Sequence, residues 1–517
     1  MTKNIENKNC KHILILGGGS AGWLTASIIA AEHCSNSENG VQVTLVESPD
    51  VPTVGVGEGT WPTMRQTLRR IGLSELTFFR ECDASFKQGT QFCQWVNGSE
   101  HDIYYHPFTL PEGYLETDLH GYWQRRGVNR SYADTFSAQA HVCAHALAPK
   151  QIATPEYAAV VNYGYHFNVG KFGQLLQRHA TEQLGVKHVL DHVSGVNSYP
   201  NGDIRSLNTR HHGELEADLF IDCSGSASFL LGQHFGVGWQ DCRSVLLNDR
   251  AVATQVPYPD AQTPIASTTI STAQAEGWIW DIALPTRRGV GHVYSSQFTS
   301  REQAERDLRK YIARGSGSDV AEQLEVRALQ FEPGYRNYFW HRNCVAVGMS
   351  AGFIEPLEAS ALVLVELAAE MIRDELPRNR TMMDFVAREF NEKFLYRWER
   401  VIEFLKLHYV LSQREGEYWQ AQRHPDSIPD SLAQKMQLWR HRPPCIYDFD
   451  RVGEVFPSAS YQYILYGMGF HTEPRVTAKR SDHDEVVERY IEEARRKTDK
   501  YLQALPSNRA LISHYAR

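Results

Sequence analysis

The stretch HILILGGGSAG, residues 12–22, decides the fold of this 517-residue chain. Its first half, His12 to Leu16, is a short apolar run that ends in glycines, which is typical of a parallel strand buried on both faces. Residues 21–32 carry the pattern of a helix, and residues 41–47 form a second run rich in β-branched residues. Strand, glycine turn, helix and strand in this order predict a βαβ unit, and hence an α/β fold.

The glycine turn fits the pattern G-x-G-x-x-G, with Gly17, Gly19 and Gly22 at the fixed positions. Gly17 permits the tight turn, Gly19 lets the backbone approach a pyrophosphate, and Gly22 lets the helix pack closely on the strand. The helix that opens at Ser20 and Ala21 offers unpaired N–H groups and a favourable dipole to the anion. A glycine turn alone often binds nothing, but the flanking strand and helix meet the context that dinucleotide binding requires.

Glu47 ends the second strand, 25 residues after Gly22. A carboxylate there can accept hydrogen bonds from an adenosine ribose. Two further stretches suited to a nucleotide return late in the chain, an apolar strand at 215–225 and a glycine turn at 347–351. Such widely spaced contacts suit FAD, a long and extended molecule, better than a nicotinamide dinucleotide.

Composition excludes several classes of protein. The formal net charge of −8 offers no electrostatic footprint for nucleic acid. Residues 1–11 are polar, and the longest apolar stretch, 359–369, is too short to span a bilayer, so we expect neither signal peptide nor membrane segment. The nine cysteines include no C-x-x-C pair, which indicates neither a disulfide framework nor a metal site and fits a cytoplasmic protein.

The rest of the chain divides into two expected regions. Residues 1–370 read as the dinucleotide-binding α/β body, in which an aromatic-rich part at 85–170 predicts irregular strands and loops over a binding region. Residues 371–517 read as a mainly helical region that packs onto this body, because 383–411 and 484–505 carry apolar residues at helical spacing.

Five blocks resemble the flavin-dependent tryptophan halogenases, and the similarity runs nearly the whole chain. They are GGGSAGWLTA (17–26), GVGEGTWPT (55–63), RECDASFKQGTQF (80–92), GWIWDI (277–282) and GMSAGFIEPLEASAL (348–362). The resemblance implies an FAD-binding, aromatic-hydroxylase-like body with a helical substrate region. It also implies that reduced FAD and O2 oxidise a halide ion, bromide or chloride, to hypohalous acid, which then halogenates an indole-like arene.

The resemblance places two catalytic residues, Lys87 and Glu358. An ammonium on a flexible stem can hold hypohalous acid against one carbon of the arene, and a positioned carboxylate can take the proton from the ring. Lys87 lies among aromatic residues. The alternatives are a surface lysine, as most lysines are, and an acid that merely stabilises a helix start.

The same blocks imply a halide site and a wall. Backbone N–H groups near Ser360 and Ala361 would bind the anion beside the flavin. Trp278 and Trp280 alternate on a strand and so point to one face, where they would separate the flavin from the substrate. Two large core aromatics would give the same pattern.

Three aromatic positions are expected to line the substrate pocket. His106 and Phe108, in the stretch 104–108, resemble the family segment that stacks on the indole, and Phe456 is a further aromatic wall. Stacking rings suit an electron-rich arene. The alternatives are ordinary core packing for the two phenylalanines and a core histidine with its hydrogen bonds satisfied for His106.

We expect the cofactor to be FADH2 supplied by a separate flavin reductase, because the sequence shows no separate motif for binding a nicotinamide cofactor. A homodimer is common in the resembling family. The residues expected to bind FAD are Gly17, Gly19, Ser20, Ala21, Gly22, Glu47, Val193, Met349 and Leu362.

Two other functions stay open. A single-component flavin monooxygenase that hydroxylates aromatics typically has a Gly-Asp pair where this chain has Gly348-Met349, and it lacks the lysine block. A non-catalytic flavin-binding redox sensor would have no need of both Lys87 and Glu358.

Departures from the family pattern bear on the substrate. Ala283 stands where the tryptophan signature has proline, and Ala359 replaces a serine. Arg451 stands near the place where a carboxylate would pair with the ammonium of free tryptophan. We therefore expect indole, or an indole on a larger scaffold, to be a better substrate than free tryptophan.

Overall fold

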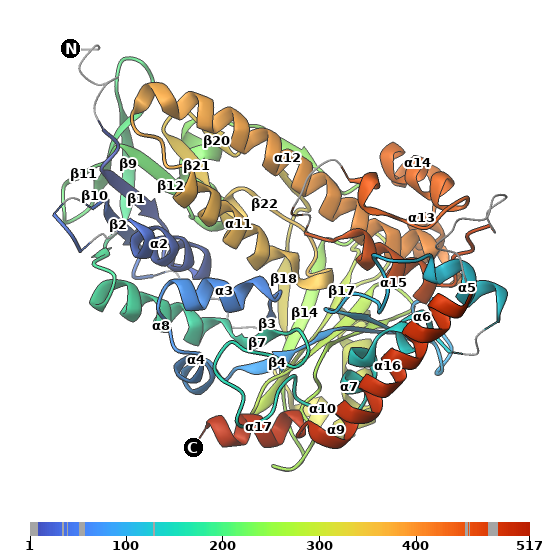
Figure 1. The fold of residues 1–517 in the computed structure, drawn as a ribbon. Coiled ribbons are helices and arrows are strands. Elements are labelled where there is room, and N and C mark those ends of the chain that lie inside the picture. The colour runs from blue at the N-terminus through green and yellow to red at the C-terminus, as the bar shows by residue number, and fades with distance from the viewer. Residues whose placement is uncertain are drawn as a thin grey trace.

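A computed structural model describes residues 9–33, 36–38, 40–50, 57–127, 130–449, 453, 455–473 and 484–516. Figure 1 shows two sheets side by side, with long helices over the first and a group of helices at the far end of the second. Within the described residues, no helix is both long and apolar enough to cross a membrane.

The first sheet contains the βαβ unit that the sequence predicts. Its strands are parallel apart from the pair at the β20 edge, and β1 lies in the middle, between β12 and β2. The helix α2 (Ser20–Glu32) follows β1 and packs against α8 (Val169–Glu182) and α11 (Ser360–Asp374). In spatial order the strands are β20 (Trp340–His341), β21 (Cys344–Ala346), β12 (Leu219–Asp222), β1 (His12–Leu16), β2 (Gln42–Glu47) and β8 (Lys187–Leu190).

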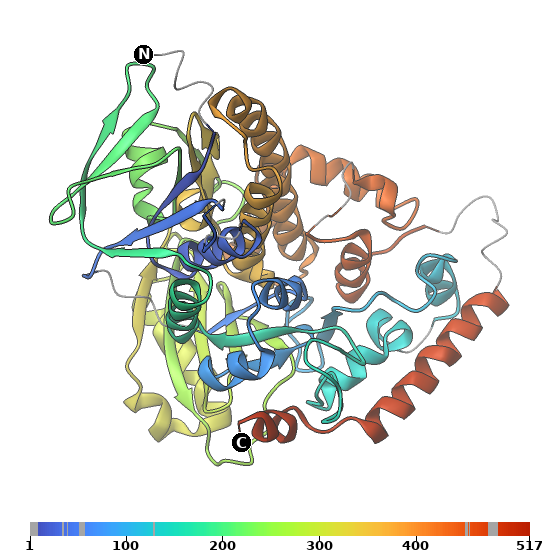
Figure 2. The ribbon, with the colours of Figure 1, turned by 60° about the vertical axis from the view of Figure 1, so that its left-hand side comes forward.

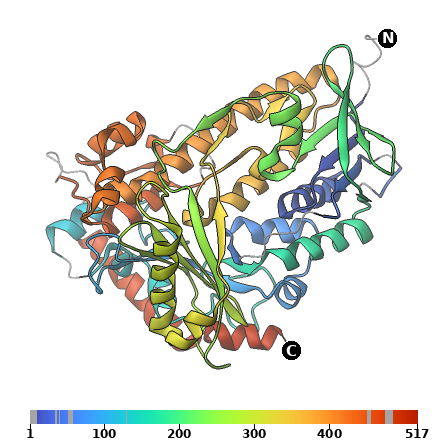
Figure 3. The same cartoon turned by 180° about the vertical axis from the view of Figure 1, so that it is seen from behind.

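The second sheet has seven strands and is antiparallel except for one pair, β15 with β5. One face packs against α9 (Arg301–Ser316), which Figure 3 shows lying across the sheet. In spatial order the strands are β18 (Arg327–Gln330), β14 (Arg250–Pro257), β17 (Arg287–Tyr294), β16 (Trp278–Ala283), β15 (Thr269–Ala273), β5 (Gly89–Cys93) and β6 (Ile103–Pro107).

A small sheet carries Lys87. Strand β7 (Gly164–Asn168) lies between β3 (Gly57–Gly59) and β4 (Ser85–Lys87). Lys87 is paired with Gly164 on β7, and Gly59 is paired with His166. A Cβ built on Gly59 would lie 3.2 Å from Lys87 Nζ, so this glycine leaves room for the ammonium.

The C-terminal helices connect both parts of the molecule. The long helix α12 (Arg380–Leu411) contacts β20 at one side and α15 (Ser458–Gly467) at another. Figure 2 shows α16 (Asp484–Ala504) lying along α5–α7, and α17 (Asn508–Tyr515) contacts β4. The predicted helices at 383–411 and 484–505 are therefore present, within a few residues of the expected bounds.

The part at 85–170 differs from the expectation of irregular strands and loops. It contains four regular strands, β4 to β7, and three short helices, α5 (Leu119–Arg125), α6 (Tyr132–Phe136) and α7 (Ala138–Ala144). Helices of five to seven residues make fewer than two full turns. A pattern that repeats every 3.6 residues is therefore too short in them to be recognised.

Candidate active site

The glycine turn has the geometry that a pyrophosphate needs. Gly17 has φ +114°, which L side chains rarely adopt. Gly19 precedes α2, no side chain caps that helix end, and a Cβ on Gly19 would meet nothing within 4 Å. The α2 N–H groups thus face open space, in which an anion can bind.

A cavity of about 300 Å3 joins this turn to the start of α11. It brings together residues that are more than 300 positions apart in the sequence, which agrees with the extended cofactor expected. The predicted FAD and halide residues that line it are Gly19, Ser20, Ala21, Met349, Ser360, Ala361 and Leu362. Gly17 and Gly22 shape the turn itself, because a Cβ on either would clash with backbone oxygen.

Glu47 and Val193 lie beyond this cavity, at the end of β2. Glu47 Oε1 is 2.8 Å from His188 Nε2, and its other oxygen lies against Gly18. Val193 begins β9 (Val193–Ser198), just after Asp191, whose N–H donates to the Glu47 carbonyl. Neither residue lines the cavity, and contacts of Glu47 and Val193 with FAD stay a prediction.

Glu58 also lines the cavity, and the sequence did not single it out. Burial raises the pKa of this carboxyl to about 7. Its neighbour Gly57 lines a second cavity of about 220 Å3, together with Trp280 and Arg287. Strand β3 thus separates the two spaces.

Lys87 is a buried residue, not the surface lysine that was the alternative. Its side chain is 1% exposed, and Nζ lies 5.4 Å from the centre of the Phe108 ring. Nζ makes no hydrogen bond or ion pair with any residue that the structure describes. Burial lowers the pKa of the ammonium to about 8, against an opposing effect of Glu358. An ammonium without a hydrogen bond or ion pair to the described residues is available to a ligand.

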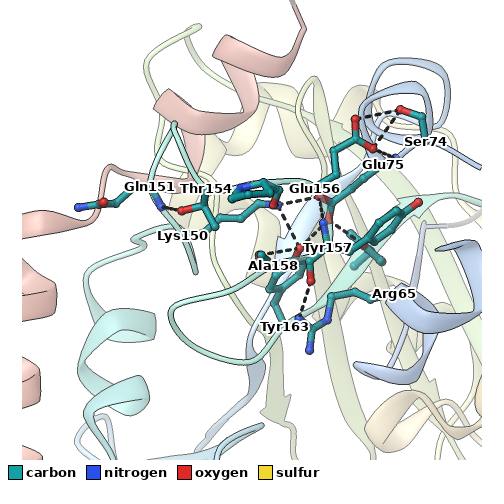
Figure 4. A network of polar contacts seen from close by, with 12 residues as sticks. Arg65, Ser74, Glu75, Lys150, Gln151, Thr154, Glu156, Tyr157, Ala158 and Tyr163 are labelled. Atoms are coloured by element: carbon teal, nitrogen blue, oxygen red, sulfur yellow. Dashed lines mark hydrogen bonds and ion pairs between the residues drawn. The ribbon is translucent and has the colours of Figure 1, made fainter.

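A buried polar network centred on Glu75 and Lys150 lies next to β4 (Figure 4). Lys150 Nζ lies 2.6 Å from Glu75 Oε2, and both side chains are at most 1% exposed. The Tyr163 and Tyr165 hydroxyls donate to the other Glu75 oxygen at 2.6 and 2.8 Å. Lys150 also lies 5.7 Å from the ring of Phe86, the neighbour of Lys87.

Glu358 has a left-handed backbone, with φ 62° and ψ 9°, and Ala359 follows with φ 55°. It stands in a tight turn ahead of α11 and is 3% exposed. The Trp61 indole N–H donates to the Glu358 carbonyl at 2.9 Å. Two successive left-handed residues without glycine are unfavourable and persist only where neighbours hold them.

Both oxygens of the Glu358 carboxylate have close polar contacts. Thr90 donates to Oε2 at 2.8 Å, His106 Nδ1 lies 2.6 Å from Oε1, and His408 Nε2 lies 3.5 Å from the same oxygen. Burial alone would raise the pKa of Glu358, but His106 and His408 outweigh it and hold the pKa well below its usual range. Glu358 is therefore an anion at neutral pH.

An aromatic cluster lies around these two charged groups. Trp61 contacts Phe108 and Phe456 at ring-centre distances of 5.4 and 4.9 Å, and Phe404 stacks on Phe456 at 3.8 Å. The structure thus brings all three predicted pocket residues together. It adds contacts that the sequence did not indicate, because His106 Nε2 also lies 2.8 Å from Ser460 Oγ on α15.

Trp61 and Phe404 are the pocket residues that sequence reasoning missed. Trp61 lies within the family block at 55–63, and nothing in that block marks it as a pocket residue. Phe404 lies inside a long helix, where its spacing signals core packing. Arg451 lies outside the described residues.

The paired tryptophans are buried and adjacent. Trp278 and Trp280 are 1% and 7% exposed, with ring centres 6.4 Å apart. Trp280 borders the second cavity, whereas Trp278 packs against Trp95 in the core. The two rings thus lie next to each other, and their role as a wall between flavin and substrate stays a prediction.

A cavity that runs from a glycine turn to the start of α11, beside an aromatic cluster with a buried lysine and glutamate, is the arrangement expected of an FAD-binding oxidoreductase. The chain belongs to the tryptophan halogenase family, whose model matches residues 12–482. It is an enzyme, a flavin-dependent halogenase, and the family implies FAD and a halide ion.

Individual relatives agree over the whole chain. A tryptophan halogenase from Shewanella frigidimarina superposes with a TM-score of 0.96 and 47% identity, covering 99% of this chain and 98% of that one. A flavin-dependent halogenase from Brevundimonas sp. BAL3 has 30% identity and a TM-score of 0.85, covering 98% and 99%. The tryptophan 6-halogenase of Streptomyces toxytricini is 31% identical over 90% of each chain.

Proposed function

We propose that this enzyme halogenates an indole-like arene with hypohalous acid that Lys87 holds and directs. The observation that carries the proposal is the buried Lys87 ammonium, without a partner among the described residues and 5.4 Å from the Phe108 ring. An electron-rich ring bound between the pocket aromatics would lie beside it.

The cofactor fits the residues present. The open space at Gly19 and the uncapped end of α2 suit a pyrophosphate, and the cavity leads from there to Ser360. Bound reduced FAD, delivered by a separate reductase, would supply with O2 the oxidant that converts halide to hypohalous acid. No side chain caps α11, so its first N–H groups, near Ser360 and Ala361, can bind the halide.

The chain's own residues then carry the substitution. The arene carbon attacks the halogen, the halogen–oxygen bond breaks, and the carbon–halogen bond forms. Lys87 donates a proton to the leaving hydroxide, which departs as water, and its pKa of about 8 keeps the ammonium mostly protonated at pH 7. Glu358, held as an anion, accepts the ring proton. Return of that proton to Lys87 resets the site.

One mixture tests the proposal. Purified protein with FAD, a flavin reductase, NADH, bromide and indole should give a product with the bromine isotope doublet. A hydroxylated product would favour a flavin monooxygenase instead. Flavin binding without any product would favour a redox sensor.

A further inference from the structure

A second buried glutamate, Glu355, stands three residues before Glu358. It is 1% exposed, and one of its oxygens, Oε2, accepts three hydrogen bonds. The donors are Trp278 Nε1 at 2.8 Å, Asn248 Nδ2 at 2.8 Å and the Tyr409 hydroxyl at 2.7 Å. They come from the wall strand β16, the segment before β14 and helix α12. One carboxylate oxygen therefore ties three separate elements together.

Glu355 stands where the chain leaves the cofactor cavity. Ile354 and Ser360 both line that cavity, and the residues between them place Glu358 against His106 in the aromatic cluster. The segment 355–359 ends in the unfavourable left-handed backbone of Glu358 and Ala359. Glu355, at its start, is held by the three hydrogen bonds to its side chain.

Helix α12 holds both ends through neighbouring residues. His408 lies 3.5 Å from Glu358 Oε1, and Tyr409 donates to Glu355. The position of the wall and the position of the catalytic carboxylate thus depend on one helix and one turn.

Burial of a carboxylate is unfavourable, and an apolar side chain at position 355 would avoid its desolvation free energy. Burial raises the pKa of Glu355, while the three hydrogen bonds lower it. Its second oxygen, Oε1, has no hydrogen-bond partner in the described part of the chain. The interactions of Glu355 are thus concentrated on the oxygen that holds Trp278, which points to a positional role.

We propose that Glu355 is a positioning residue that fixes the Trp278 wall and the Glu358 turn as one unit, so that hypohalous acid is delivered to the arene and not lost. This inference rests on the proposed function. Under this proposal, oxidation of the flavin needs only the cofactor cavity. Transfer of the halogen to the arene also needs Trp278 and the Glu358 turn in their correct positions.

The test measures coupling, defined as halogenated indole formed per FADH2 oxidised, with a chemical trap for hypohalous acid that escapes. In Glu355→Leu, coupling should fall about tenfold or more while flavin oxidation stays within about twofold, because small misplacements cost large factors in rate. Trapped hypohalous acid should rise. Glu355→Gln should retain most of the coupling, because an amide oxygen can accept from the same donors.

Variants at Tyr409 and Glu366 test whether the effect is specific to the hydrogen bonds of Glu355. Tyr409→Phe removes one donor with little change of shape and should lose part of the coupling, even if Glu355→Leu fails to fold. Glu366→Leu is the matched control: Glu366 is equally buried, is held by the Thr63 and Thr67 hydroxyls, and has its pKa raised to about 8 by burial. Its coupling should match the wild type.

Wild-type coupling in folded Tyr409→Phe, or in folded Glu355→Leu, would overturn the positioning role. An equal loss in folded Glu366→Leu would overturn it too, because removal of any buried glutamate would then have the same effect. A wild-type enzyme that oxidises FADH2 but forms no halogenated arene overturns the proposed function itself, and is recognised before any variant is made.

Discussion

His106 Nδ1 lies 2.6 Å from Glu358 Oε1, and both side chains are at most 2% exposed. The two residues are 252 positions apart in the sequence. His106 therefore orients the Glu358 carboxylate and helps to hold its pKa below the usual range, whether or not its ring also stacks on a substrate as predicted. Ser460, on the other ring nitrogen, holds the imidazole in place.

Replacement of Lys87 should separate the two half-reactions. Lys87→Ala should still oxidise FADH2 and consume O2, because the ammonium acts only after the oxidant has formed, while halogenated product falls at least a hundredfold, the usual scale for a positioned proton donor. Mass spectrometry of the product and an oxygen electrode measure the two rates. Lys171→Ala, at a half-exposed lysine paired with Asp83, is the control. Product at the wild-type rate would show that Lys87 is structural.

The pH dependence should report the same ammonium. Lys87 has its pKa lowered to about 8, so the proton donor is present below pH 8 and is lost as pH rises through it. Product per FADH2 oxidised should fall about tenfold per pH unit above that point. Glu358, with its pKa held well below the usual range, should add no change between pH 6 and 8. A flat profile to pH 10 would contradict the assignment.

Gly19→Val should weaken FAD binding without unfolding the protein. A Cβ at Gly19 meets no protein atom, so the added side chain fills only the space that the pyrophosphate would occupy. A loss of about 2 kcal/mol or more in binding is expected, the scale of one or two hydrogen bonds to a charged group. Titration of flavin fluorescence measures it, with Gly173→Val, another open glycine, as control. Unchanged affinity in folded Gly19→Val would rule out this loop.

Loss of the buried ion pair should destabilise the body of the enzyme. Lys150→Met leaves the Glu75 carboxylate buried without its cation, which costs about 3–5 kcal/mol. Arg125→Met, in an exposed pair with Asp484, should cost less than about 1 kcal/mol. Denaturant unfolding compares the two. Equal, small effects would mean that the network contributes little.

The substrate scope should favour indole over free tryptophan. Free tryptophan needs partners for both of its charges, because an unpaired buried charge is costly, whereas indole needs only the aromatic pocket of Phe108 and Phe456. We expect kcat/KM for indole, or for an indole on a larger scaffold, to exceed that for tryptophan. A tryptophan value tenfold above that of indole, about 1.4 kcal/mol in transition-state binding, would overturn this expectation.

The sequence by itself determined the dinucleotide turn and the family. Gly17, Gly19 and Gly22 act through local backbone conformation, so their spacing is readable without a fold. The blocks around Lys87 and Glu358 were equally readable as short contiguous patterns, and the structure places both residues in one buried site.

Only the tertiary structure decided what surrounds them. Thr90, His408 and Ser460 come from three elements far apart in the chain, and no periodicity relates them to Glu358 or to His106. The lowered pKa of Lys87 likewise depends on burial by residues distant in sequence. Hydrogen bonding and desolvation act through space at a few ångströms, so partners are known only once the chain has folded.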